Sequence, residues 1–386
     1  MQPLSPVALS IPASGIRAIA NAAMARSGVV RLEIGEPDFD TPAHIVEAAH
    51  RAARDGFTRY TESKGLLSLR EAISAKLARV NSIACPPDRV IVTHGALSGL
   101  CSTAFALLAP GDEMLVPDPG WPNWAMMIRL AGGVAIPYPC PASGQFMPDL
   151  DRLESLVSPR TRAIIVNSPS NPTGAVLGQQ WVEAMLEFAA RHDLWLVSDE
   201  CYDEIVFEGS APSPAALDPQ GRVVTLHSCS KTYAMTGWRI GYASAPPQLA
   251  AVLASLQQPL LGNASSVAQK AAEAALTGPQ DCVVRMRDAY RARRDSFVRL
   301  MADAGRPFHP PAGAFYAMLP LPERITDTMA FAMHLLEHHG IAVAPGDAFG
   351  AGGAGHLRLA LCVDESMIRS ALPVILAAAE AWPGQA

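Results

Sequence analysis

The chain has 386 residues, of which 49% are hydrophobic and 17% are charged, and its formal net charge is −6. This length predicts two domains or one large α/β unit rather than a single small core. The acidic balance argues against a general nucleic-acid-binding protein, which needs a basic surface to displace counterions. The sequence has no apolar run of membrane-spanning length and no basic region followed by an apolar one at its start, so we expect neither a membrane span nor a signal peptide.

The seven cysteines are scattered along the chain and form no C-x-x-C pair. This pattern is typical of reduced thiols in a cytoplasmic protein, and it favours neither a disulfide framework nor a zinc site. We therefore predict a cytoplasmic location and no metal centre.

The N-terminal segment is predicted to form an arm, a helix over 16–26, a short strand over 31–35 and a turn-rich loop over 36–42. Thr41 is expected to cap the helix that follows, with Pro42 at its first position, because proline suits the first turn of a helix.

The middle of the chain alternates apolar strands with helices, beginning with an amphipathic helix over 67–80. This alternation predicts a mostly parallel sheet covered by helices on both faces. Ligands bind such sheets beyond the carboxyl ends of the strands, where Asn167, Asp199 and Ser228 are expected to lie. The predicted strands are 89–93, 114–117, 163–167, 194–199 and 223–226.

The last part of the chain begins with a helical region over 245–300 that is broken at Gly262 and Gly278. A smaller α+β unit follows, with strands at 314–319 and 356–362 and helices at 328–340 and 365–382. The predicted fold is α/β: a large domain over 41–280 with a mostly parallel central sheet flanked by helices, and a smaller α+β domain built from both chain ends, namely 1–40, which includes the N-terminal arm, and 281–386.

One lysine, Lys231, lies between small polar residues and is followed eight positions later by Arg239. A desolvated lysine can lose its proton and attack a carbonyl. The short polar side chains, such as Ser228, and the arginine can hold a phosphate. This combination indicates a Schiff-base lysine for pyridoxal 5′-phosphate, PLP. The alternative is a turn with an exposed lysine.

Asp199 ends an apolar strand, where a carboxylate is costly without a cationic partner. A pyridinium nitrogen is such a partner, and a protonated ring is an electron sink. The hydroxyl of Tyr202, three residues later, can face the same ligand. A structural salt bridge for Asp199 and simple packing for Tyr202 are the alternatives.

The proline-rich loop over 167–174 is rigid enough for Asn171 to present its amide to a phenolic oxygen. Trp121 follows a predicted strand and can stack on a flat ring. Arg358 is a charge within a predicted strand, where its guanidinium fork suits a carboxylate. The alternatives are a tight turn for Asn171 and a core or interface position for Trp121.

The segment Gly95-Ala96-Leu97 stands where a strand turns into a helix, so its free N–H groups can bind an anion. A plain strand–helix junction is the alternative.

Two further patterns are not interpreted as sites. The G-x-G-x-x-G run over 350–355 precedes a predicted strand instead of a helix, and we predict a flexible loop there. The H-x-x-E-H run over 334–338 has leucines suited to a packed helix, so we predict no metal site.

The chain resembles the class I/II aminotransferases of the fold-type-I PLP enzymes over nearly its whole length. The resemblance rests on separate motifs that follow one another in the family's order. These are the segment over 35–42, Tyr60, the segment over 95–97, Trp121, the segment over 171–174, Asp199, Tyr202, Ser228, Lys231, Arg239 and Arg358.

The resemblance implies PLP as the cofactor and a role for each of these residues. Lys231 would form the Schiff base and shuttle the substrate α-proton. The resemblance implies that Asp199 contacts the pyridine nitrogen, that Tyr202 and Asn171 contact the phenolate, and that Trp121 stacks on the ring. It also implies that the phosphate is held by Ser228, Arg239 and the N–H groups of Gly95, Ala96 and Leu97. Arg358 would bind the substrate α-carboxylate in a pocket lined by Gly35 and Asn171.

The resemblance also implies a homodimer with shared active sites, because Tyr60 matches a tyrosine that reaches the phosphate of the neighbouring subunit. Several relatives that prefer aspartate carry a lysine at the position of Leu97. Since Leu97 has no charge, we expect a neutral, aliphatic or aromatic amino donor.

The predicted function is a PLP-dependent aminotransferase that moves an amino group between an L-amino acid and a 2-oxo acid by ping-pong half-reactions. A carbon–sulfur β-lyase on the same fold is the nearest alternative. A transcription regulator with this fold is disfavoured, because only about 30 residues precede the 33–42 segment, too few for a helix-turn-helix domain.

Overall fold

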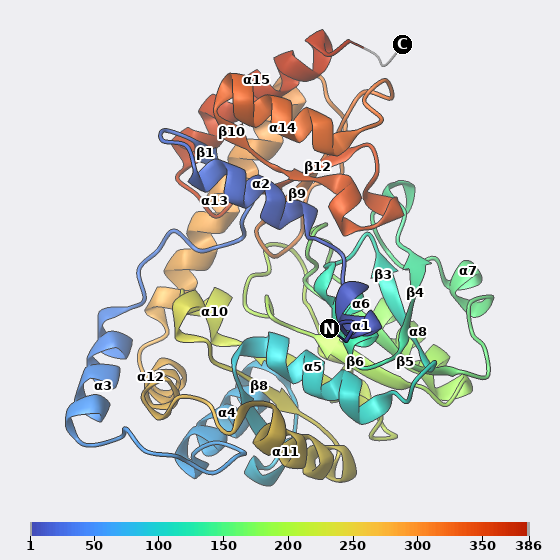
Figure 1. The fold of residues 1–386 in the computed structure, drawn as a ribbon. Coiled ribbons are helices and arrows are strands. Elements are labelled where there is room, and N and C mark those ends of the chain that lie inside the picture. Colours follow the sequence, from blue (N-terminus) through green and yellow to red (C-terminus); the bar gives the residue numbers. More distant parts are fainter. Residues whose placement is uncertain (1, 384–386) are drawn as a thin grey trace.

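The computed structural model describes residues 2–383 and has the predicted α/β fold (Figure 1). A seven-stranded sheet lies at its centre in the order β2-β8-β7-β6-β5-β3-β4. β8 is antiparallel to both neighbours, and the remaining pairs are parallel. The strands are β2 Val90–Thr93, β3 Glu113–Asp118, β4 Val134–Pro139, β5 Thr161–Asn167, β6 Trp195–Asp199, β7 Val223–Ser228 and β8 Gly241–Ser244.

Two of these strands, β4 and β8, are absent from the sequence prediction. β4 is an edge strand that contains Pro137 and Pro139, residues that an edge tolerates but that disguise a strand in sequence. β8 has only four residues and directly follows the polar segment around Lys231. The five predicted strands are confirmed.

Helices cover both faces of this sheet because its strands are apolar on both faces. Ile165 of β5 packs in the cluster with α5, α6 and α11, whereas its neighbours Ile164 and Val166 pack in the cluster with α8. The helices of this large unit are α3 Ala43–Arg54, α4 Leu67–Asn81, α5 Gly95–Leu107, α6 Asn123–Leu130, α7 Leu150–Glu154, α8 Gln179–Arg191, α9 Pro214–Leu217, α10 Cys229–Thr232, α11 Pro247–Leu261 and α12 Ser266–Thr277.

The predicted cap of α3 is wrong. Pro42 occupies the capping position, and no side chain accepts a hydrogen bond from the first turn. The Thr41 hydroxyl instead donates to the carbonyl oxygen of Ala234 at 2.6 Å and accepts from Trp238 Nε1 at 3.1 Å. Thr41 therefore joins this loop to the segment that follows Lys231.

The smaller α+β unit draws on both ends of the chain. β1 Val30–Arg31 pairs in parallel with β10 Ile341–Ala342, and Ile19 and Leu32 share one buried cluster with Leu335 and Leu359. Its other elements are α2 Gly15–Met24, α13 Asp281–Asp303, β9 Tyr316–Pro320, α14 Thr328–His339, β11 Ala344–Pro345, β12 His356–Ala360 and α15 Glu365–Ala381. The short N-terminal helix α1 Pro6–Leu9 lies instead next to α6 of the large unit, where Arg129 Nη1 donates to the Ser10 carbonyl oxygen at 2.7 Å.

The domain boundaries at 41 and 281 remain a prediction, and their outer spans include residue 1 and residues 384–386, which lie outside the described residues. The breaks predicted at Gly262 and Gly278 are confirmed, since they separate α11, α12 and α13. The 350–355 run leads into β12 with no helix after it.

Within residues 2–383, no helix combines the length and apolar character needed to cross a bilayer. The same residues bring together no group of three or more His, Cys, Asp or Glu side chains able to hold a metal ion. All seven cysteines are free thiols.

Candidate functional site

A cavity of about 620 Å³ opens at the carboxyl ends of β5, β6 and β7, between the large and small units. This is the sheet edge at which the sequence predicted a ligand. The cavity gathers most of the predicted site residues from distant parts of the chain: Gly35, Ala96, Leu97, Trp121, Asn171, Asp199, Tyr202, Ser228, Lys231, Arg239 and Arg358.

Two predicted residues do not line this cavity. Gly95 lies one residue before the lining pair Ala96 and Leu97, at the first position of α5. Tyr60 is 95% exposed on the surface of the chain.

Lys231 lies on the short helix α10, directly after β7. Its Nζ donates a hydrogen bond to the carbonyl oxygen of Gly35 at 2.6 Å. No carboxylate in residues 2–383 forms an ion pair with this amine. Burial lowers the pKa of Lys231, because a low-dielectric site disfavours the ammonium form. The amine can therefore act as a nucleophile.

Asp199 is the last residue of β6 and is only 4% exposed. Its carboxylate accepts hydrogen bonds from Trp124 Nε1 at 3.2 Å and from the Cys201 amide at 3.3 Å. Burial raises its pKa. No Lys, Arg or His side chain of the described chain lies within ion-pair distance of it, so this carboxylate fits a cationic pyridinium nitrogen.

Tyr202 and Tyr316 present two buried hydroxyls to the cavity, with their oxygens 2.9 Å apart. Burial raises the pKa of Tyr202 well above its ordinary value and that of Tyr316 to about 12. Both phenols therefore stay protonated near neutral pH and can donate to a ligand oxygen.

Arg358 lies on β12 and is 3% exposed. Its Nη1 donates to Asn171 Oδ1 at 3.1 Å, and its guanidinium carbon lies 4.4 Å from the Tyr316 ring centroid and 4.8 Å from that of Phe349. Burial lowers its pKa. Among the described side chains no carboxylate forms an ion pair with Arg358, which leaves its fork suited to a substrate carboxylate.

Asn171 is held in place from within the sheet edge. Asn167 Oδ1 accepts a hydrogen bond from the backbone N–H of Asn171 at 2.8 Å. Asn167 Nδ2 donates to the backbone carbonyl oxygen of Asp199 at 2.9 Å. These bonds join the ends of β5 and β6, so the loop that carries Asn171 is fixed relative to Asp199.

The other end of the cavity suits a phosphate. α5 begins at Gly95 with no side-chain cap, so the first N–H groups of this 13-residue helix lack intrahelical partners, and Ala96 and Leu97 of this first turn line the cavity. A Cβ on Gly95, whose φ is +67°, would lie 2.8 Å from Arg239 Nη2. Glycine therefore lets Arg239 approach the helix start, close to Ser228 at the end of β7.

The sequence prediction missed Trp124 and Tyr316. Trp124 follows Trp121 by three residues in the same short segment after β3, and this proximity could have placed it near the same site. Trp121 lies edge-on to it, with ring centroids 6.2 Å apart. Tyr316 lies in a buried strand of the small unit and carries no sequence signal that separates it from a core tyrosine.

A family model described as aminotransferase class I and II matches residues 27–375. The chain belongs to the class I and II aminotransferases. Members of this family depend on PLP, so the protein is a PLP-dependent aminotransferase that moves an amino group to a 2-oxo acid. The unpaired Asp199, the amine of Lys231 and the anion site at α5 fit that cofactor.

Similar aminotransferases come from several bacteria. The aspartate/prephenate aminotransferase of Thermus thermophilus is 39% identical over 96% of this chain and 95% of its own. The arginine–pyruvate transaminase of Pseudomonas aeruginosa is 38% identical over 93% of this chain and 92% of its own. The solved structure of the Thermus thermophilus aspartate aminotransferase with maleate has a TM-score of 0.92 at 38% identity, and the match covers 98% of this chain and 100% of that chain.

Proposed function

We propose that Lys231 is the amine to which PLP is attached, and that the enzyme transfers the amino group of a neutral, aliphatic or aromatic L-amino acid by a ping-pong mechanism. The observation that carries this proposal is that one cavity is lined by three side chains without ionic partners in the described chain. They are Lys231, whose pKa is lowered, the buried carboxylate of Asp199 and the buried guanidinium of Arg358.

Bound PLP withdraws electrons from the substrate α-carbon and so makes its proton acidic. Asp199 would hold a proton at the pyridine nitrogen, Tyr202 and Asn171 would contact the phenolic oxygen, and Trp121 would pack on the ring. Ser228, Arg239 and the N–H groups of Gly95, Ala96 and Leu97 would hold the phosphate.

Lys231 Nζ would take up and carry the substrate α-proton. A neutral amine is required for this step, and the lowered pKa of Lys231 supplies one near physiological pH. Arg358 fixes the α-carboxylate in a bidentate contact, with Gly35 and Asn171 completing that end of the pocket. Release of the 2-oxo acid empties the site for the second half-reaction.

The choice of amino donor depends on the lining around Leu97, which is 38% exposed. Ile16 adds a second apolar side chain to the cavity, and both favour a neutral substrate side chain. Arg17 also lines the cavity and offers a cation to an acceptor with a second carboxylate, such as 2-oxoglutarate. Relatives are named for aspartate and for arginine, so these two amino acids are the necessary comparisons.

A panel of amino donors, with pyruvate or 2-oxoglutarate as acceptor, tests the proposal. We expect leucine, methionine or phenylalanine to have a higher kcat/KM than aspartate or arginine. In Leu97→Lys, the preference should move towards aspartate because a cation replaces an apolar side chain and adds to the charge of Arg17 in the cavity. A parent enzyme that prefers aspartate or arginine would contradict the neutral donor. Pyruvate formed from cystathionine without any 2-oxo acid would instead indicate the β-lyase.

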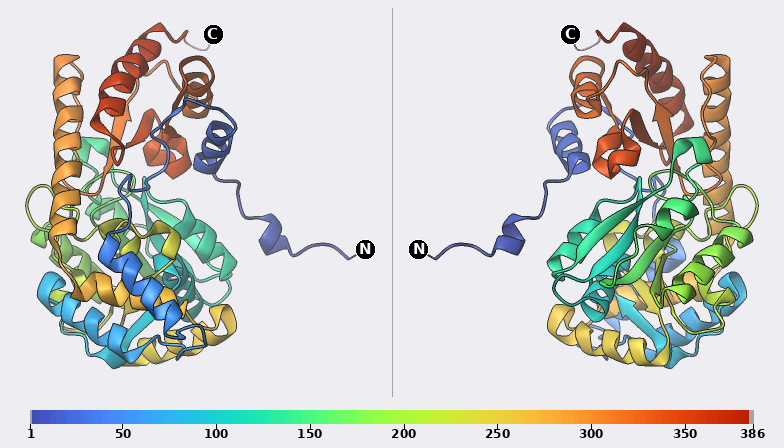
Figure 2. Two further views of the ribbon diagram at one scale, coloured as in Figure 1. Left: turned by 90° about the vertical axis from the view of Figure 1, so that its left-hand side faces the viewer. Right: turned by 90° about the vertical axis from the view of Figure 1, so that its right-hand side faces the viewer.

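The proposal includes a homodimer with shared sites. Tyr60 is almost fully exposed, and Figure 2 shows the N-terminal segment extending away from the rest of the chain. Both features suit contact with a second copy. Mixing inactive Lys231→Ala subunits with Tyr60→Phe subunits should form dimers with one fully intact site, and activity no higher than in the separate variants would contradict sharing. The free cysteines support a cytoplasmic location.

A further inference from the structure

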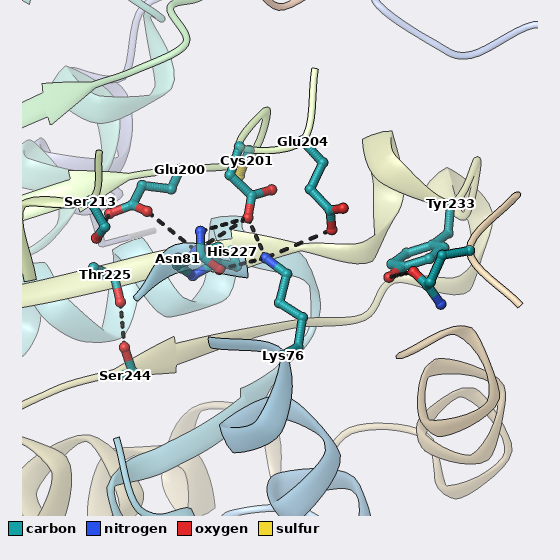
Figure 3. Close-up of polar contacts among 12 residues, drawn as sticks. Lys76, Asn81, Glu200, Cys201, Glu204, Ser213, Thr225, His227, Tyr233 and Ser244 are labelled. Atoms are coloured by element: carbon teal, nitrogen blue, oxygen red, sulfur yellow. Dashed lines mark hydrogen bonds and ion pairs between the residues drawn. The ribbon is translucent and has the colours of Figure 1, made fainter. Parts of the chain in front are cut away.

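A buried polar network lies behind the cofactor site, on the side of the sheet end that faces α4 (Figure 3). It joins three segments: α4, the turn after β6 and the end of β7. Its members are Lys76, Asn81, Glu200, Asp203, Glu204 and His227.

Lys76 is the centre of one half of this network and is only 2% exposed. Its Nζ forms an ion pair with the Asp203 carboxylate and donates to Asn81 Oδ1 at 2.8 Å. Asn81 Nδ2 in turn donates to Asp203 Oδ2 at 3.0 Å, and Glu204 Oε1 lies 3.9 Å from the lysine amine. Asp203 is thus held by two side chains of α4.

His227 is the centre of the other half and is 1% exposed. Its Nε2 lies 3.4 Å from Glu200 Oε2 and 3.6 Å from Asp203 Oδ2. The imidazole stacks on the Tyr242 ring with centroids 5.1 Å apart and planes inclined by 13°. Glu200 accepts a hydrogen bond from the Ser213 hydroxyl at 2.7 Å, so this carboxylate joins the end of β7 to the segment before α9.

The charges in this network depend on one another. Burial alone would raise the pKa of Asp203, but the charges of Lys76 and His227 hold it below its ordinary value. Burial and the neighbouring Asp203 raise the pKa of Glu204. Removal of Lys76 would therefore leave Asp203 in a buried site without its principal counter-ion.

Network residues and cofactor-facing residues alternate along the same two segments. In the turn after β6, Asp199 and Tyr202 line the cavity, whereas Glu200 and Asp203 belong to the network. On β7, His227 belongs to the network, and the next residue, Ser228, lines the cavity. A displacement of the network side must therefore move the cofactor side as well.

We propose that Lys76, Asp203 and His227 are positioning residues. They hold the turn after β6 and the end of β7 in the relative position that the cofactor contacts of these segments require. The role rests on the proposed function of Asp199, Tyr202 and Ser228 as cofactor contacts. None of the three positioning residues lines the cavity, so each acts through its neighbours in sequence.

The test is Lys76→Met, which keeps an unbranched side chain, one heavy atom shorter, and removes its charge. We expect weaker PLP binding and a shifted absorption maximum of the bound cofactor. The kcat should fall by roughly 10- to 100-fold, because small misplacement of catalytic groups is costly. The KM for the donor should stay near the parent value, since Arg358 keeps its contacts. Lys76→Arg keeps the charge and should restore the parent spectrum and kcat.

Lys270→Met is the matched control, because Lys270 pairs with Glu273 on the outer helix α12 and does not line the cavity. It should leave the spectrum, PLP affinity and kcat unchanged. If Lys76→Met does not fold, Asp203→Asn tests the positioning role instead. We expect the same weaker PLP binding, shifted absorption maximum and lower kcat.

A folded Lys76→Met or Asp203→Asn protein with the parent spectrum, PLP affinity and kcat would overturn the positioning role. A parent protein without transaminase activity would overturn the proposed function instead, while PLP affinity and spectrum would still report on the network.

Discussion

Lys231 and Lys76 belong to the same unit, but only Lys76 has a carboxylate partner among the described residues. Lys76 is buried against the Asp203 carboxylate and the Asn81 side chain. Lys231 opens to the cavity and, among residues 2–383, donates only to the Gly35 carbonyl oxygen; burial lowers its pKa. The difference separates their roles, because the Lys76 amine is engaged by a carboxylate within the chain, whereas a desolvated amine without such a partner can become a nucleophile.

The same contrast holds for the groups around each lysine. On the cavity side, Asp199 and Arg358 have no ionic partner in the described chain, and PLP and a substrate carboxylate can supply one. On the network side, Lys76 and His227 lie against carboxylates of the chain. Charged groups without an ionic partner in the described chain thus lie at the cavity, and ion-paired groups form the network behind it.

Loss of the free amine should have the largest effect. In Lys231→Ala, transamination should fall on the order of 10⁴-fold or more, because the residue is both nucleophile and proton carrier. Stopped-flow or steady-state assay of the PLP-loaded variant measures this. A variant that transaminates at the parent rate would remove Lys231 from the mechanism.

Loss of the guanidinium fork should have the next largest effect. In Arg358→Lys, kcat/KM for every donor should fall by roughly 100-fold, since one point charge replaces a bidentate contact at a buried site. The exposed Arg162→Lys is the control and should behave like the parent. Equal kcat/KM in Arg358→Lys and the parent would place the carboxylate contact elsewhere.

The lowered pKa of Lys231 should be visible directly in the cofactor-free protein. Burial disfavours the ammonium form, so the neutral amine should be present at lower pH than in an ordinary lysine, whose pKa is about 10.4. Competitive acetylation at several pH values, read by peptide mass spectrometry, gives the midpoint for Lys231. A midpoint at or above the ordinary value would show that the amine is not desolvated.

The smallest effect is expected far from both lysines. Asp327 caps α14, and its carboxylate accepts from the Ala330 amide at 2.8 Å. Asp327→Ala should lower the free energy of unfolding by about 1 kcal/mol. Thermal or denaturant unfolding measures this, and kcat should not change. A changed kcat at parent stability would mean that α14 is coupled to the site.

The sequence indicated the charged residues of the cavity side, missed Trp124 and Tyr316 there, and gave no sign of the network side. Asp199 and Arg358 stand out because a charge ends or interrupts an apolar strand, and Lys231 stands out because it lies between small polar residues ahead of Arg239. Lys76 lies on an amphipathic helix where a lysine is ordinarily exposed, and its partner Asp203 is 127 residues away. Such a pairing depends on how α4 packs against the sheet end, which local patterns do not specify.

The errors in the fold have the same origin. Thr41 has the composition of a helix cap, but the tertiary contacts with Ala234 and Trp238 use its hydroxyl instead. The short strand β8 is defined by its pairing with β2 and β7 and not by its own four residues.

Reduction of the PLP-loaded protein with borohydride, followed by peptide mass spectrometry, tests the central claim most directly. The reagent fixes the cofactor to whichever lysine holds it. We predict one pyridoxyl group per chain, on Lys231, and none on Lys76. A label on Lys76 or on any other lysine, or no label at all, would contradict the account.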